Sequence, residues 1–142
     1  MNRIFKTLFV AFVGFLIWII YQRDVGAQLG FIGFIAAIPY GDKWGHFFLF
    51  GTLTFITILA TQFHRFSAPR LNAVYSAPLL IAIVVALEET SQLYLDTRTF
   101  EWLDLVADAL GILVFAFAAR LVELRSLDAQ ADEQSALPKS TP

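Results

Sequence analysis

The sequence predicts an all-α, polytopic membrane protein, built as a bundle of about four transmembrane helices. Hydrophobic residues make up 58% of the 142 residues and charged residues only 15%, with a mean hydropathy of +0.66. Soluble domains carry roughly 25% charged residues, so this chain requires lipid as its solvent. At about 20 residues per crossing, the apolar segments suffice for four helices and leave no room for a separate soluble domain.

The N-terminal segment contains the first predicted helix, over residues 4–21. Arg3 and Lys6 stand at the start of this apolar run, and Val25-Gly26-Ala27 follows it. A basic start, an apolar stretch and small residues at that place also fit a cleaved secretory signal, but we favour a retained anchor. The next apolar stretch, 29–38, is too short to cross a bilayer, which predicts a short interfacial segment between helices one and two.

Three further apolar runs predict the remaining helices, over 43–62, 71–93 and 102–124. Asp42 precedes the second helix as its expected N-cap, because a carboxylate there accepts hydrogen bonds from the amides of the first turn. Pro78 is expected to kink the third helix, since proline removes a backbone donor.

The segment after the last helix differs in composition from the rest of the chain. Residues 128–142 include Asp128, Asp132 and Glu133 and few apolar side chains. Such a stretch buries too little apolar surface to offset the entropy of ordering, so we expect a disordered cytoplasmic tail. The transmembrane domain is therefore expected over 1–127.

The basic residues predict which helix ends face the cytoplasm. With four crossings, the N-terminus, the turn between helices two and three and the tail share one side. That side holds seven of the ten basic residues: Arg3, Lys6, Arg65, Arg70, Arg120, Arg125 and Lys139. The other side holds Arg23, Lys43 and Arg98. The positive-inside rule therefore places both termini in the cytoplasm.

Polar residues that could carry chemistry gather at the opposite, extracytoplasmic ends of the predicted helices. They are Asp42, Lys43 and His46 at the start of helix two, Glu88, Glu89 and Gln92 at the end of helix three, and Arg98, Asp104 and Asp108 around the start of helix four. A charged side chain inside a transmembrane helix costs at least ~2.5 kcal/mol on insertion scales. These residues are therefore expected to line one pocket between the helices.

Helical spacing supports that expectation. Residues four apart share a helix face, as in the pairs Asp42 and His46, Glu88 and Gln92, and Asp104 and Asp108. The adjacent Glu88 and Glu89 point about 100 degrees apart, so they cannot both face one partner. Gly111 continues the stripe of the last helix and permits close approach of a neighbour at the floor of the pocket.

We interpret His46, Glu89 and Asp104 as the candidate catalytic residues, because imidazole and carboxylate groups can exchange protons near neutral pH. The candidate ligand-binding residues are Asp42, Lys43, Glu88, Gln92, Arg98 and Asp108. Lys43 and Arg98 would recognise anionic groups. Structural hydrogen bonds between helices are the alternative role for these residues. Asp42, His46, Glu89 and Asp104 could also ligate a metal, but with one histidine on that side the sequence predicts neither metal nor cofactor.

Three sequence blocks recur together in one known family. They are Asp42-Lys43-Trp44-Gly45-His46-Phe47, then Glu88-Glu89-Thr90-Ser91-Gln92, then Arg98 followed by Asp104, Asp108 and Gly111. Across these blocks the chain resembles the VanZ-like family of small bacterial membrane proteins. Family members usually carry asparagine where Asp108 stands. The family's namesake is linked to resistance toward a glycopeptide antibiotic, so the resemblance implies an envelope role in the bacterial inner membrane.

Three functions fit these observations. The leading hypothesis is a pocket that binds a lipid headgroup or a lipid-linked cell-wall precursor. The second is a hydrolase or transferase acting on a lipid-linked substrate, and the third is a structural or partner-binding membrane protein. The absence of cysteine excludes thiol catalysis and thiolate metal sites, and without a basic stripe nucleic acid is not an expected partner. The oligomeric state is left open.

Overall fold

The computed structural model describes residues 2–26, 30, 33–34, 37–68, 71–94 and 99–136. Within these residues, four helical segments are long and apolar enough to cross a membrane. They are α1 (Asn2–Asp24), α3 (Gly41–Ala60), α4 (Ser76–Ser91) continued by the 3₁₀ turn η1 (Gln92–Tyr94), and α5 (Trp102–Ala136). The all-α class and the four candidate membrane-spanning helices are thus confirmed, and the chain is compatible with a multi-pass membrane protein.

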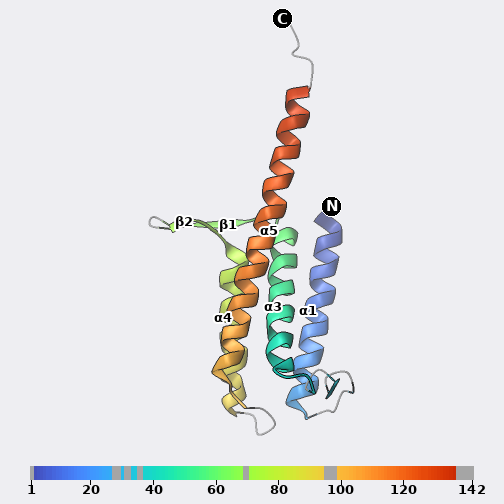
Figure 1. Ribbon diagram of the computed structural model, residues 1–142, viewed down its shortest axis with the longest axis vertical. Helices are drawn as coiled ribbons and strands as arrows, with labels where there is room; N and C mark the ends of the chain where they lie inside the picture. Colours follow the sequence, from blue (N-terminus) through green and yellow to red (C-terminus); the bar gives the residue numbers. More distant parts are fainter. Residues whose placement is uncertain are drawn as a thin grey trace, which may run out of the picture.

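The four helices run alternately up and down in sequence order (Figure 1). The start of α3, the end of α4 and the start of α5 lie at one end of the bundle, which we call the site end. The start of α1 and a two-stranded hairpin lie at the opposite end. This arrangement brings together the three helix ends that carry the candidate residues.

Helix α3 is the central element, because it packs against α1, α4 and α5. One apolar core joins all four helices: it contains Leu16 of α1, Phe50 and Leu53 of α3, Ile81 and Val85 of α4, and Ile112 of α5. Large apolar side chains on the outer faces stay exposed, among them Ile17, Leu80 and Phe117. A lipid solvent explains both observations, since apolar side chains are favourable both in the core of the bundle and on its lipid-facing surface.

The prediction that helix three starts at residue 71 is wrong, because a β-hairpin precedes this helix. Strands β1 (Arg65–Ala68) and β2 (Leu71–Tyr75) pair antiparallel, and α4 begins only at Ser76. Val74 and Tyr75 are residue types that favour strands, and the cross-strand pairing supplies partners for backbone groups. Backbone pairing with β1 therefore overrode the apolar pattern.

Pro78 consequently lies in the first turn of α4 instead of inside a longer helix. Backbone amides in the first turn have no acceptor within the helix, so proline costs no hydrogen bond there. Pro78 is therefore a residue suited to a helix start, and not one that kinks the interior of a helix.

The start of α3 also differs from the prediction, because Asp42 is not its N-cap. The cap residue is Tyr40, in the left-handed conformation with φ 58° and ψ 26°, and it makes no capping hydrogen bond through its side chain. Asp42 lies inside the first turn, where a negative charge is favoured by the helix dipole. There it pairs with the neighbouring Lys43.

Helix α5 is longer than the predicted 102–124. It continues to Ala136, so residues 128–136 are helical and not disordered, in keeping with the strong helix formers Ala, Gln and Glu in this stretch. A 35-residue helix is about 52 Å long, so α5 extends well beyond a hydrocarbon core of ~30 Å. Residues 137–142, and half of the interfacial segment predicted over 29–38, lie outside the described residues.

Candidate functional site

The predicted polar residues converge at the site end. Asp42, Lys43 and His46 come from the first turns of α3, Glu88 and Glu89 from the end of α4, Gln92 from η1, and Asp104 and Asp108 from the start of α5. Arg98 lies outside the described residues. Residues more than sixty positions apart, such as His46 and Asp108, are in direct contact.

Lys43 lies at the centre of a network of carboxylates. Its Nζ is 2.6 Å from Asp42 Oδ2 and 2.8 Å from Asp104 Oδ1, and it also pairs with Glu101. Glu101 was not among the residues predicted from the sequence, although an acidic residue directly before a predicted helix is a recognisable signal. Three carboxylates neutralise the ammonium group, so the geometry does not favour the predicted role of Lys43 in recognising an anionic ligand.

His46 is held in one orientation by Asp108. Its Nδ1 lies 3.1 and 3.2 Å from the two Asp108 carboxylate oxygens, and Asp108 is only 1% exposed. Because a carboxylate accepts the hydrogen bond, Nδ1 carries the proton. The other ring nitrogen, Nε2, faces Asp104 Oδ2 at 3.8 Å, beyond hydrogen-bond distance. Nε2 is therefore the atom of His46 that is available for chemistry.

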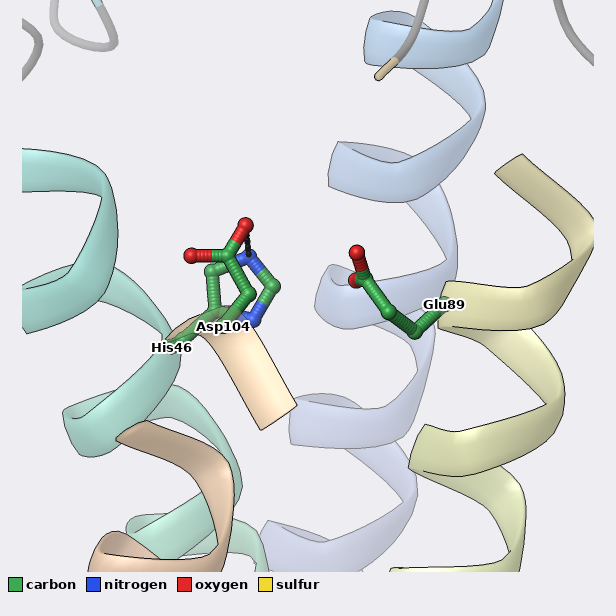
Figure 2. Close-up of side chains that lie close together, drawn as sticks. All are labelled: His46, Glu89 and Asp104. Atoms are coloured by element: carbon green, nitrogen blue, oxygen red, sulfur yellow. Dashed lines mark ion pairs between the residues drawn. The ribbon is translucent and has the colours of Figure 1, made fainter. Parts of the chain in front are cut away.

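Glu89 is fully buried at the junction of α4 and α5, with 0% exposure. Its Oε1 accepts a hydrogen bond from the backbone amide of Glu101 at 2.9 Å, and its Oε2 accepts one from Gln92 Nε2 at 2.9 Å. These neutral donors compensate part of the cost of burying the carboxylate. They also fix its direction, so that Glu89 lies close to His46 and Asp104 (Figure 2).

Gly111 brings α5 close enough to α3 for these contacts. A Cβ atom at Gly111 would overlap the backbone carbonyl of Phe47. The predicted role of Gly111 in close helix approach is therefore confirmed. The approach lies one turn beyond Asp108, and it holds that carboxylate against His46.

A groove of about 440 Å³ opens between α1 and α3 beside this cluster. Its walls are mainly apolar and include Phe15, Leu16, Ile19, Phe48 and Leu49. Arg23, Asp42, His46 and Glu88 give the groove its polar residues.

The predicted single pocket is thus divided into two parts. Asp42, His46 and Glu88 line the groove, whereas Glu89, Asp104 and Asp108 lie in the cluster between α3, α4 and α5. The division follows the predicted angle between Glu88 and Glu89, since these neighbours face different parts of the site.

The contribution of α1 to this groove was not predicted from the sequence. Phe15, Ile19 and Arg23 recur every four residues along α1 and share one face. That spacing was a usable signal, but the surrounding residues are uniformly apolar. In such a helix the sequence does not distinguish a face that lines a groove from a face that contacts lipid.

A second polar cluster ties the hairpin to α5 at the opposite end. Glu123 Oε2 accepts a hydrogen bond from the Tyr75 hydroxyl at 2.5 Å and pairs with Arg65 and Arg120. The Arg65 guanidinium also lies 4.6 Å from the centre of the Tyr75 ring. Burial and the Glu123 carboxylate raise the pKa of Tyr75, so its hydroxyl remains a hydrogen-bond donor at neutral pH.

The arrangement at the site end supports two kinds of chemistry. The groove can take an apolar chain next to polar groups, and Nε2 of His46 can accept a proton or bind a cation. Neither a protein-family model, nor a curated protein, nor a solved structure matches the chain, and its function is therefore inferred from its own residues.

Proposed function

We propose that the chain is a VanZ-like protein of the bacterial cell envelope that binds a lipid in the groove between α1 and α3. The observation that carries this proposal is a groove of about 440 Å³ with apolar walls and charged residues in its lining. Its size is within the range of ligand pockets, roughly 300–1,000 Å³. An acyl or polyprenyl chain would contact the apolar walls, and the headgroup would contact the polar residues.

The polar lining favours a phosphate-bearing headgroup. Arg23 is the cation among the described lining residues, and it forms no ion pair with another described residue. A guanidinium can bind phosphate through two parallel hydrogen bonds. Asp42 and Glu88 can accept hydrogen bonds from headgroup hydroxyl or amine groups. Anionic phospholipids and polyprenyl phosphates share this chemistry.

The resemblance to the VanZ-like family extends the proposal to the cell envelope. The blocks that carry it, 42–47, 88–92 and 98–111, overlap the site end of the bundle. With both termini in the cytoplasm, the headgroup would be bound at the outer face of the inner membrane. A lipid-linked precursor of the cell wall is then the proposed physiological ligand.

A substitution that fills the groove tests this proposal. Gly45 lines the groove, and a Cβ there meets no atom within 4 Å, so Gly45→Leu adds bulk without a backbone clash. Gly14→Leu is the matched control, because Gly14 is outside the groove lining and also has open space around it. We expect Gly45→Leu to reduce co-purifying lipid at least tenfold, measured by mass spectrometry of protein in mild detergent. Equal lipid content in both variants would contradict groove binding.

Arg23→Gln tests the headgroup. We expect this variant to lose anionic lipids selectively and to retain zwitterionic ones, because the apolar walls are unchanged. Binding of added polyprenyl phosphate and of phosphatidylglycerol, measured separately, distinguishes the two sources of phosphate. Unchanged binding of both lipids would exclude Arg23 as the headgroup contact.

One observation favours a second candidate, a hydrolase or transferase acting on the same lipid. His46 lines the groove, and Asp108 holds its Nδ1 so that Nε2 remains able to accept a proton. A general base must be within hydrogen-bond reach of its substrate, and a headgroup in the groove would meet that condition. Turnover of the bound lipid by the wild type, abolished in His46→Gln, would support this candidate.

A further inference from the structure

We infer that His46, Glu89 and Asp104 form a site for a divalent transition-metal ion, Zn²⁺ or Mn²⁺, between α3, α4 and α5. Asp108 is the residue that orients the histidine. This site is distinct in chemistry from the proposed lipid groove and does not depend on lipid binding.

The three side chains come from three helices and bring their donor atoms together. One ligand atom from each residue lies within 4.8 Å of the other two. Figure 2 shows the Asp104 carboxylate beside the His46 ring, with Glu89 reaching from α4 toward them. Metal–ligand bonds of ~2.0–2.2 Å bring donor atoms to within ~4 Å of one another, so small side-chain rotations would complete the site.

Asp104 is buried, and one of its two carboxylate oxygens faces His46 while the other faces Lys43. Its side chain is only 9% exposed, and its Oδ1 is buried and paired with Lys43 Nζ at 2.8 Å. Oδ2 is 3.8 Å from His46 Nε2, a separation too long for a hydrogen bond and short enough for both atoms to ligate one ion.

Asp108 completes the arrangement around the histidine. A metal-binding histidine usually donates its other ring proton to a carboxylate or carbonyl oxygen. His46 donates from Nδ1 to the buried Asp108 carboxylate, which directs Nε2 toward Asp104. Gln92 and the backbone amide of Glu101 orient Glu89 in a similar way.

The charge balance of the cluster also favours a cation. Glu89, Asp104 and Asp108 are all buried between helices. Among the described residues, Lys43 is shared among Asp104, Asp42 and Glu101, so it compensates only part of this negative charge. Buried carboxylates without sufficient positive charge destabilise a bundle, and a divalent ion would add positive charge to this cluster.

The donor set determines the class of metal. One imidazole nitrogen and two carboxylates suit first-row transition metals such as Zn²⁺ and Mn²⁺. Mg²⁺ prefers an octahedral shell of oxygen ligands that keeps several waters. Mg²⁺ is therefore expected to compete only weakly.

Metal binding to the purified full-length protein tests the inference. After chelator treatment in detergent, we expect ZnCl₂ or MnCl₂ to load one ion per chain, measured by elemental analysis and titration calorimetry. His46→Gln, Glu89→Gln and Asp104→Asn should each weaken binding at least tenfold. Wild-type protein that binds neither ion, or binds no better than these variants, would overturn the inference.

A matched control separates this site from the neighbouring acidic group. Asp42, Glu101 and Asp104 also place carboxylate oxygens within 4.8 Å of one another. Glu101→Gln removes a carboxylate that contacts Lys43 through its side chain and leaves the three proposed ligands in place. We expect its affinity to stay within threefold of the wild type. Loss of binding in Glu101→Gln with retention in His46→Gln would assign the ion to the other group.

A readout without substitutions keeps the test decisive if the variants do not fold. The chain has two histidines, His46 and His64. Replacing the ion with Co²⁺ should give one strongly shifted, exchangeable imidazole proton in the NMR spectrum, from Nδ1–H of His46. Absence of such a signal in Co²⁺-loaded wild type would exclude ligation by His46.

Discussion

At the scale of single residues, His46 links the two parts of the site end. It lines the groove, and its two nitrogens face two different carboxylates of α5, Asp108 and Asp104. A histidine is suited to this position because one ring nitrogen can donate while the other stays available. The function of His46 therefore depends on which group forms the hydrogen bond with its Nδ1.

The exchange Asp108→Asn tests the orienting role. The asparagine side-chain oxygen can still accept the hydrogen bond from His46, so we expect stability within about 1 kcal/mol of the wild type. Asp108→Leu leaves the buried imidazole donor without a partner and should cost about 1–3 kcal/mol. Thermal unfolding of the detergent-purified variants measures the difference. Equal losses in both variants would show that the hydrogen bond is not what Asp108 contributes.

Two conservative variants distinguish a working site from structural hydrogen bonding. His46→Gln and Asp104→Asn keep approximate size and polar character while they remove the titratable group. We expect both variants to accumulate normally in the membrane and to change susceptibility to antibiotics that act on the envelope. Membrane abundance and susceptibility are measured side by side. Normal abundance with unchanged susceptibility in both would favour the structural alternative.

At the scale of helices, the close contact between α3 and α5 at Gly111 allows the packing of the bundle to be tested. Gly111→Ala places a methyl group against the Phe47 carbonyl, so the two helices must separate. We expect a loss of about 1–3 kcal/mol, the usual cost of overpacking. Gly14→Ala, with nothing within 4 Å of the added Cβ, should be neutral or slightly stabilising. Thermal unfolding of both variants tests this, and similar stabilities would show that α3 and α5 adjust freely.

The hairpin and α5 form the second testable contact between elements. Tyr75→Phe removes the hydroxyl that donates to Glu123 and keeps the ring beneath the Arg65 guanidinium. We expect a loss of about 0.5–1.5 kcal/mol and faster proteolysis at the hairpin, because one link to α5 is gone. Cleavage rates of the variant and the wild type, compared on gels, provide the measurement. An unchanged rate would mean that the two arginine pairs hold the hairpin without Tyr75.

At the scale of the whole molecule, the bundle separates a basic end from the end that carries the proposed sites. Arg65 lies on the hairpin at one end, and Lys43 lies at the other among acidic partners. The positive-inside rule then predicts that a phosphatase reporter is active when fused after Asp96 and inactive when fused after Ser67. The opposite pattern would place the groove's polar residues in the cytoplasm and remove the cell-wall precursor from consideration.

The candidate site was predictable only in part. Helical spacing and the cost of charge in lipid indicated that Asp42, His46, Glu89 and Asp104 should converge. The same reasoning did not indicate that Lys43 would be neutralised by three carboxylates, or that Glu101 would take part. Those pairings depend on how the first turns of α3 and α5 face each other.

By itself, the sequence indicated that the helices are suited to a lipid environment, how many helices there are, and at which end of the bundle the charged residues gather. Apolar runs long enough for a bilayer admit few other structures, because lipid offers no partners for backbone polar groups. Tertiary structure decided the rest. Pairing of β1 with β2 set where α4 begins, and the close approach at Gly111 placed Asp108 on His46. The face of α1 that lines the groove was also decided there, since a uniformly apolar helix gains its orientation only from the neighbour it packs against.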